Sequence, residues 1–227
     1  MAEAVSRILP FAAAVAIVPI PIIAVILVLF SQRARANGPL FALGWASGLA
    51  VAFVVLLALA DAGDGTEDGS ASDAIGWGRV LLGLALLALA VRTWRGRPPA
   101  GETAELPGWM AGIDEMAPSR ALVLGVALAG VNPKNLILIA GAAAALAPLD
   151  PSRGDTVAAL VTFVVVGSLT VVGPVVYSLV GGAHAATVLD ELRTWLGANN
   201  AAVMSVLLLV FGVVLLSNGL APLTGGG

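Results

Sequence analysis

A single lysine lies between two asparagines inside an apolar stretch, in the run Val131-Asn132-Pro133-Lys134-Asn135. Lys134 is about fourteen residues from Arg120, or roughly 21 Å along a helix, which places it near the centre of a bilayer. A charged side chain at that depth costs about 2.5 to 3.5 kcal/mol on insertion scales, and such residues usually mark substrate or ion pathways. The pattern therefore indicates a functional group.

The partners open to Lys134 are limited by its surroundings. No Asp or Glu occurs within the apolar runs, so the ammonium can meet backbone carbonyls, water or a bound anion. Asn132 and Asn135 add donors, and a helix starting after Pro133 would direct free N–H groups and its positive dipole end into the same space. We expect an anion site here, and purely structural satisfaction of the lysine by carbonyls is the alternative.

A second break, Val18-Pro19-Ile20-Pro21, lies near the middle of the first apolar stretch. Proline removes a backbone donor and clashes with the preceding turn, so both helices should be kinked or unwound. In lipid, loose backbone is tolerated only where protein or a water-filled cavity covers it. Simple kinking by isolated prolines is the alternative. The expected substrate-binding residues are Pro19, Pro21, Asn132, Pro133, Lys134 and Asn135.

The composition requires these residues to work inside a membrane. Of the 227 residues, 59% are apolar and only 11% are charged, against roughly 25% charged residues in a soluble domain. A water-soluble enzyme and a nucleic-acid binder are therefore excluded. A crossing needs about 20 apolar residues. The chain offers six such segments: Ile8–Phe30, Leu40–Ala60, Ala74–Trp94, Ala121–Leu149, Val157–Val180 and Leu196–Leu220.

The two breaks fall at matching places in the first and second triplets of spans. Because three is an odd number, the two halves would insert with opposite topology, as in many secondary transporters. We therefore predict an all-α polytopic membrane protein of six transmembrane helices, built as two inverted three-helix repeats with broken first and fourth helices. The predicted organisation is a first repeat at 1–95, a cytoplasmic loop with a short interfacial helix at 96–118, and a second repeat at 119–227.

The loops alternate in basic charge. The loops after the second and fourth spans contain one Lys or Arg, Arg153, whereas the loops after the first and third spans contain six. Because cytoplasmic loops are enriched in Lys and Arg, both termini are predicted to lie outside a bacterial plasma membrane. The loops after the first and third spans hold Arg33, Arg35, Arg92, Arg95, Arg97 and Arg120.

Three weaker patterns allow more than one reading each. Gly44 and Gly48 form a GxxxG motif, which predicts close helix packing first, with dimerisation or hinge motion after it. The acidic segment 61–73 has the composition of a calcium loop but lacks the closing glutamate, so we expect a solvated loop. In the long inner loop, helical spacing predicts either a short helix on the membrane surface or packing against the bundle. Its apolar residues are Trp109, Met110, Ile113 and Met116.

Catalytic and metal chemistry have little support. Cysteine is absent, which excludes disulfides and thiolate sites. No hydrolase serine motif or metalloprotease helix is present, His184 is the single histidine, and Met204 is the one soft ligand within the spans. We therefore expect no enzyme activity, no catalytic residue, no metal and no cofactor.

Three stretches together resemble the GAP family of sulfolipid-addressing and glycopeptidolipid-addressing proteins, within the lysine-exporter superfamily. They read PIPIIAVILVLFSQRARANGPLFALGWASG, WMAGIDEM and ALVLGVALAGVNPKNLILIAGA. The resemblance covers nearly the whole chain. It implies a six-span exporter-like fold that moves envelope lipids or glycolipids across the plasma membrane of high-GC Gram-positive bacteria. It also implies that the six expected site residues line the pathway.

The leading expectation is an exporter of an anionic, lipid-linked or glycolipid substrate. An accessory subunit of a larger lipid-export complex is the second, and an exporter of a small amino acid or ion is the third. Expected partners are membrane lipids, the anionic substrate, and either a second copy or a larger exporter, with no nucleic acid. Fold analogy alone does not choose among these functions.

Overall fold

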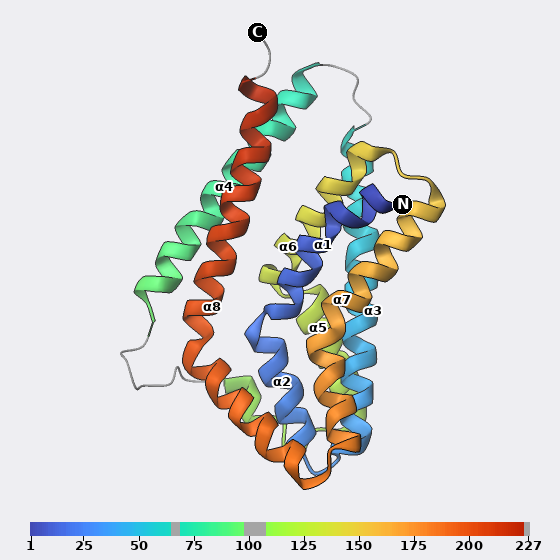
Figure 1. Ribbon diagram of the computed structural model, residues 1–227, viewed down its shortest axis with the longest axis vertical. Helices are drawn as coiled ribbons and strands as arrows, with labels where there is room; N and C mark the ends of the chain where they lie inside the picture. The colour runs from blue at the N-terminus through green and yellow to red at the C-terminus, as the bar shows by residue number, and fades with distance from the viewer. Residues whose placement is uncertain (65–68, 98–107, 225–227) are drawn as a thin grey trace. The chain divides into compact units, whose positions relative to one another are not determined.

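The computed structural model describes residues 1–64, 69–97 and 108–224, and every regular element in these ranges is a helix (Figure 1). The predicted all-α class is therefore confirmed. The long helices are α1 (Ala2–Ile17), α2 (Pro19–Phe30), α3 (Ala34–Asp64), α4 (Gly69–Arg95), α5 (Pro118–Gly130), α6 (Pro133–Leu146), α7 (Arg153–Val180) and α8 (Gly182–Thr224). Two short 3-10 turns, η1 (Gly108–Gly112) and η2 (Ala147–Leu149), complete the set.

Several helices have the length and composition of membrane spans. Helices α3, α7 and α8 each pass this test over Ala34–Ala60, Arg153–Val180 and His184–Ser217. The pairs α1–α2 and α5–α6 pass it together, which gives up to five spans among the described residues. The third predicted span forms α4, some of whose side chains lie outside the described residues, and α4 is not included in that number. The helices are those of a multi-pass membrane protein.

Both proline-containing breaks form where the sequence predicts them. Helices α1 and α2 are bent by 50° at Val18, and the α5 and α6 segments are bent by 54° at Val131-Asn132. Pro19 and Pro133 each occupy the first position of the second helix of their pair. At that position the missing N–H costs no hydrogen bond, because the first residues of a helix have no intrahelical acceptor. Each proline thus ends one helix and begins the next.

The chain forms two compact units. The first contains Met1–Asp61 and Glu105–Gly197, and the second contains Ala62–Ala104 and Ala198–Gly227. Helix α8 therefore contributes its first part to one unit and its second part to the other. The predicted partition at 1–95, 96–118 and 119–227 divides the chain by sequence repeat rather than by contact, and it stays a prediction.

In the first unit, α3 and α5 approach at backbone distance. A Cβ atom on Gly44 would lie 2.1 Å from the carbonyl oxygen of Leu122, and one on Gly125 would lie 2.3 Å from that of Phe41. Gly48 faces the next turns of α5 in the same way. Small residues permit such close approach between membrane helices. The GxxxG motif is therefore used for packing within the chain.

Helix α3 also packs against α7, which lies beside it in Figure 1. The rings of Phe53 and Phe163 are 5.0 Å apart between centroids. The fully buried indole of Trp45 donates a hydrogen bond to the carbonyl of Gly167 at 3.2 Å. These contacts fix α7 against α3 at the level where Gly167 also approaches Val15 of α1.

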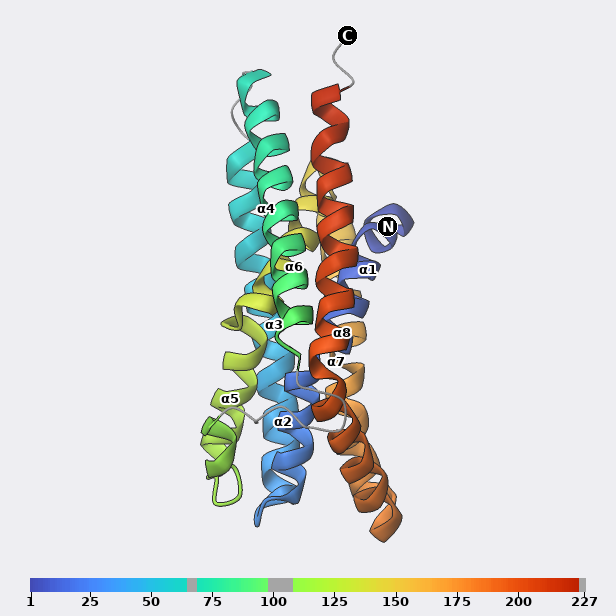
Figure 2. The same ribbon diagram turned by 90° about the vertical axis from the view of Figure 1, so that its left-hand side faces the viewer.

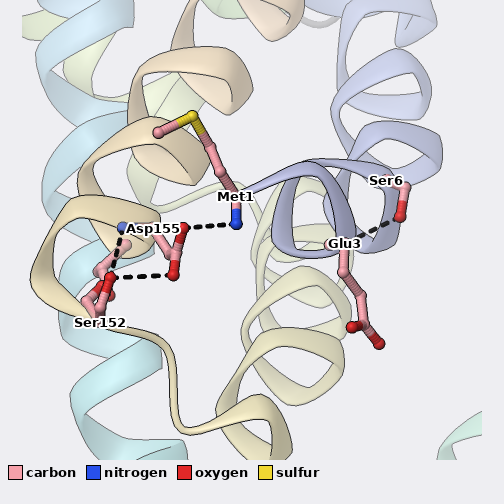
Figure 3. Close-up of polar contacts among 6 residues, drawn as sticks. Met1, Glu3, Ser6, Ser152 and Asp155 are labelled. Atoms are coloured by element: carbon pink, nitrogen blue, oxygen red, sulfur yellow. Dashed lines mark hydrogen bonds and ion pairs between the residues drawn. The ribbon is translucent and has the colours of Figure 1, made fainter.

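The N-terminal end of α7 is capped and held near the start of α1 (Figure 3). The backbone N–H of Asp155 donates to Ser152 Oγ at 3.2 Å, and this hydroxyl donates to the Asp155 carboxylate at 2.9 Å. The same carboxylate forms an ion pair with the N-terminal ammonium of Met1. An acidic group in the first turn also interacts favourably with the positive end of the helix dipole.

The segment 108–116, which begins with η1, packs within the first unit against the start of α3 and the residues before it. Met110 and Ile113 are buried. The backbone N–H of Gln32 donates to the carbonyl of Asp114 at 3.2 Å, and the Asn37 amide donates to that of Met116 at 3.0 Å. Of the two readings of this segment, packing against the bundle is therefore the one that the structure supports. The side chain of Trp109, the loop residues 98–107 and part of the acidic segment lie outside the described residues.

In the second unit, α4 and the last part of α8 run side by side (Figure 2). A Cβ atom on Gly83 would lie 2.9 Å from the carbonyl oxygen of Gly212. One on Gly212 would lie 3.1 Å from the Gly83 carbonyl oxygen and 2.8 Å from the Leu87 side chain. A glycine on each helix thus allows the close crossing.

Candidate functional site

The α5–α6 break is closed by the side chain of Asn132. The side-chain Oδ1 atom accepts a hydrogen bond from the backbone N–H of Lys134 at 3.1 Å. The backbone carbonyl of Asn132 accepts a hydrogen bond from the N–H of Leu136 at 3.0 Å. Asn132 is the N-cap of α6. Asparagine is favoured at the N-cap because its side chain satisfies an N–H group that the helix leaves unpaired. Pro133 has no N–H to offer. Fewer free N–H groups therefore face the break than the sequence predicts.

Asn135 connects the two helices across the break. Its side chain is 0% exposed, and Nδ2 donates to the carbonyl of Leu128 in α5 at 2.8 Å. The Oδ1 atom of the same amide is buried without a hydrogen-bond partner. Such an unsatisfied group costs about 1 to 3 kcal/mol. A ligand that donates a hydrogen bond to this oxygen would recover that cost.

Lys134 is half-buried in the first turn of α6. Its ammonium forms no hydrogen bond or ion pair with the part of the chain that the structure describes, where the ion pairs are those of Asp155, Glu3 and Asp190. The positive end of the α6 dipole adds to the charge of the lysine. The electrostatics at this end of α6 therefore favour an anion.

The two asparagines differ from the sequence expectation in their roles. The sequence predicts that both surround an anion with donors. In the structure, Asn132 uses its oxygen as a helix cap, and Asn135 uses its nitrogen to hold α5. Among the described side chains at the break, the polar groups without a hydrogen-bond partner are therefore the Lys134 ammonium, Asn132 Nδ2 and one acceptor, Asn135 Oδ1.

The α1–α2 break has a different chemistry. Pro19 and Pro21 are both buried, and neither has an N–H, so Ile20 carries the one amide among the first three residues of α2. On the α1 side, the N–H of Val18 donates to the carbonyl of Val15 at 3.3 Å, and the hydroxyl of Thr170 in α7 donates to the carbonyl of Ala16. The side chains at this break are therefore apolar, and two hydrogen bonds support its α1 side.

In the first unit, each half of one broken helix packs against one half of the other. Helix α1 packs against α6, and α2 packs against α5, while α7 packs along both α1 and α2. The first half of one broken helix thus contacts the second half of the other. Among the described residues, no hydrogen bond or ion pair joins Pro19 or Pro21 to the segment 132–135. That the two breaks share one site stays a prediction.

Sequence reasoning missed the contribution of α7. Thr170 supports the first break, Gly167 accepts from Trp45, and Ser168 is 4% exposed with an unpartnered hydroxyl. The available signal was the grouping Gly167-Ser168-Leu169-Thr170 within an otherwise apolar span. Polar side chains in a membrane helix normally find partners on neighbouring helices.

Comparison with known proteins assigns the family. The family profile described as Sap, sulfolipid-1-addressing protein, matches residues 8–221, a range that includes both breaks and Lys134. No curated protein and no solved structure shows significant similarity to the chain. The resemblance noted from the three sequence stretches is therefore confirmed. On this match, which covers nearly the whole sequence, the chain belongs to the sulfolipid-1-addressing protein family.

Proposed function

We propose that this protein is an integral membrane exporter that moves an anionic, lipid-linked or glycolipid substrate of the envelope across the bacterial plasma membrane. The observation that carries the proposal is Lys134, half-buried and without an acidic partner among the described residues, in the first turn of a helix that begins at a break. The family description refers to a sulfolipid. The head group of a sulfolipid is an anion, which suits this lysine.

The proposed pathway runs along the two breaks. In this proposal the chain has six spans in two inverted repeats with both termini outside, and the breaks lie near the middle of the membrane. The packing of α1 on α6 and of α2 on α5 supports it, because backbone that leaves a helix inside a membrane has to line a cavity or be covered by protein. The lining residues are Pro19, Pro21, Asn132, Pro133, Lys134 and Asn135.

Two other functions were open on sequence grounds. An accessory subunit of a lipid-export complex would need a surface for its partner, and the glycine face of α3 was the argument for one. Gly44 and Gly48 contact α5 of the same chain, so this face does not support the accessory role. An exporter of small amino acids or ions remains the competing transporter, and a substrate panel separates it from the proposed one.

The test is to replace Lys134 in protein reconstituted in neutral lipid nanodiscs. Lys134→Gln keeps the approximate length and polarity but removes the charge, so we expect it to fold like the parent. We expect its affinity for an anionic lipid such as a sulfated glycolipid to fall by about 1.5 to 3 kcal/mol, the worth of a hydrogen bond to a charged group. Binding is measured by titration calorimetry.

The matched control is Arg153→Gln, which removes one positive charge at an exposed position on α7 and should leave binding unchanged. Lys134→Arg should retain part of the affinity, because it keeps the charge and alters the donor geometry. Unchanged binding in Lys134→Gln would refute the anion site. A preference of the parent for cationic ligands would favour the competing amino-acid or ion exporter.

A further inference from the structure

We propose that the first part of α8, residues 182–197, lies in the surface layer of the membrane and packs one apolar side on lipid. The partner is the boundary between the head groups and the acyl chains, on the side of the membrane where Arg33 and Arg35 lie. The inference does not depend on Lys134 or on the identity of the substrate. It gives a lipid-binding surface to a segment that hydropathy places largely between the fifth and sixth predicted spans.

The length of α8 exceeds one crossing of a bilayer. Its 43 residues would form a helix about 64 Å long, whereas a bilayer with its head groups is roughly 40–45 Å thick. The usual tilt of about 20° lengthens the crossing by only about 3 Å. About ten residues of α8 therefore have to lie outside the crossing.

The chain holds the first part of α8 close to the membrane. Helix α7 is a candidate span over Arg153–Val180, and Gly181 is the single residue between α7 and α8. The guanidinium of Arg193 lies 6.0 Å from the ring of Phe30, the last residue of α2. Figure 1 shows this part of α8 beside the end of α2. The segment 182–197 therefore lies at the end of two apolar helices, where a membrane surface is expected.

The loop between α2 and α3 marks the level of the lipid head groups. Arg33 and Arg35 are exposed, and in the described part of the chain neither forms an ion pair. With Gln32 and two alanines they line a surface cavity of about 400 Å³. Arginine side chains at the end of a span extend toward the phosphate layer. Since Phe30 is three residues before Arg33, its contact with Arg193 places α8 close to this layer.

The side chains of the segment 182–197 form three sides of a helix. The exposed apolar stripe of α8 has the spacing i, i+4, i+7, which places its residues on one side. It consists of Val188, Leu192 and Trp195. The buried residues are Ala185, Leu189 and Leu196. The exposed polar residues are His184, Thr187, Asp190, Glu191 and Thr194. An apolar stripe between a packed side and a polar side is typical of a helix that lies in the membrane surface.

The size and composition of the stripe favour lipid over a second protein. Three side chains expose far less than the about 800 Å² that each partner contributes to a stable protein interface. Tryptophan is enriched at the boundary between membrane and water, where its apolar ring and its N–H group meet different surroundings. The spans before and after this segment are both in contact with the bilayer. Lipid is therefore the partner within reach of the stripe.

The test places single nitroxide spin labels in the cysteine-free chain. Leu192→Cys carries the label on the stripe, and Thr194→Cys carries it on the polar side. The labelled full chain is placed in nanodiscs of phosphatidylcholine and phosphatidylglycerol. Electron paramagnetic resonance then measures collisions of each label with oxygen, which concentrates in lipid, and with a water-soluble nickel chelate. Val165→Cys, at an exposed position within the α7 span, gives the reference value for lipid.

We expect the label at Leu192→Cys to lie about 5–10 Å below the head groups. Its oxygen-to-nickel collision ratio should be several-fold higher than that of Thr194→Cys and should approach that of Val165→Cys. Val188→Cys repeats the measurement on the stripe, so the inference is tested even if Leu192→Cys does not fold.

Two results would overturn the inference. Equal, water-like ratios on the stripe and on the polar side would show that the stripe faces water. Low collision rates with both reagents on the stripe would show that a protein, such as a second copy of the chain, covers it. Adding Lys134→Gln should leave the ratios unchanged, so a failure of the anion site would not affect this result.

Discussion

Single side chains at the two breaks decide which backbone groups stay free. Asn132 and Asn135 are three residues apart and chemically identical, yet one accepts and the other donates. The sequence predicts that polar residues lie here, because proline in an apolar run predicts a break. It does not predict their division of labour, since each hydrogen bond depends on the angle at which α6 leaves α5.

Thr170 offers a test of how the first break is supported. Thr170→Val keeps the shape of the side chain but removes the donor to the Ala16 carbonyl, so the thermal unfolding midpoint in detergent should fall, by a free-energy loss of about 1 to 3 kcal/mol. Thr156→Val, on the same helix, removes a local bond to Ser152 near the helix end. Its effect should stay within about 0.5 kcal/mol. Equal effects of the two substitutions would show that Thr170 does not support the break.

At the level of helices, the sequence predicts spans better than helix ends. The sixth predicted span is Leu196–Leu220, whereas α8 extends over Gly182–Thr224. Hydropathy detects the apolar part alone. The preceding segment carries Asp190, Glu191 and Arg193 and contains no proline, so nothing in it stops the helix. Close crossings such as that of α3 and α5 require knowledge of which helices are neighbours, which a hydropathy pattern does not give.

The α3–α5 crossing predicts a sharp difference between two glycines. Gly44→Ala would place a methyl group 2.1 Å from the Leu122 carbonyl oxygen, so the helices must separate. Gly173→Ala, on α7, would meet nothing within 4 Å. We expect a loss of about 1 to 3 kcal/mol for Gly44→Ala and no loss for Gly173→Ala, where alanine also favours the helix. Thermal unfolding of both purified variants measures this, and equal stability would argue against the crossing.

At the scale of the whole chain, the proposed repeat can be compared with the two compact units. In that proposal α4 and the last part of α8 are the third spans of their halves. These two segments make up the helices of the second unit, and the first two spans of each half belong to the first unit. Spans that the proposal treats as equivalent thus share a unit, and the repeat itself stays a prediction.

The orientation of the chain is the prediction to test at this scale. The basic loops predict that residue 70 lies outside and residue 100 inside. Because the protein has no cysteine, Ser70→Cys and Ala100→Cys can each be treated with an impermeant thiol reagent in intact cells. We expect Ser70→Cys to be labelled and Ala100→Cys to be protected. The reverse pattern would invert the topology, and labelling of both would change the number of spans.

Trp45 also gives the protein a natural optical reporter. Its indole is 0% exposed and bonded to α7, whereas Trp77, Trp94 and Trp195 are 57%, 46% and 56% exposed. Brominated lipids or aqueous acrylamide should therefore quench these three tryptophans first, and the residual emission should contain that of Trp45. Any movement of α7 away from α3 during transport would shift the wavelength and lifetime of that residual emission, without an added dye.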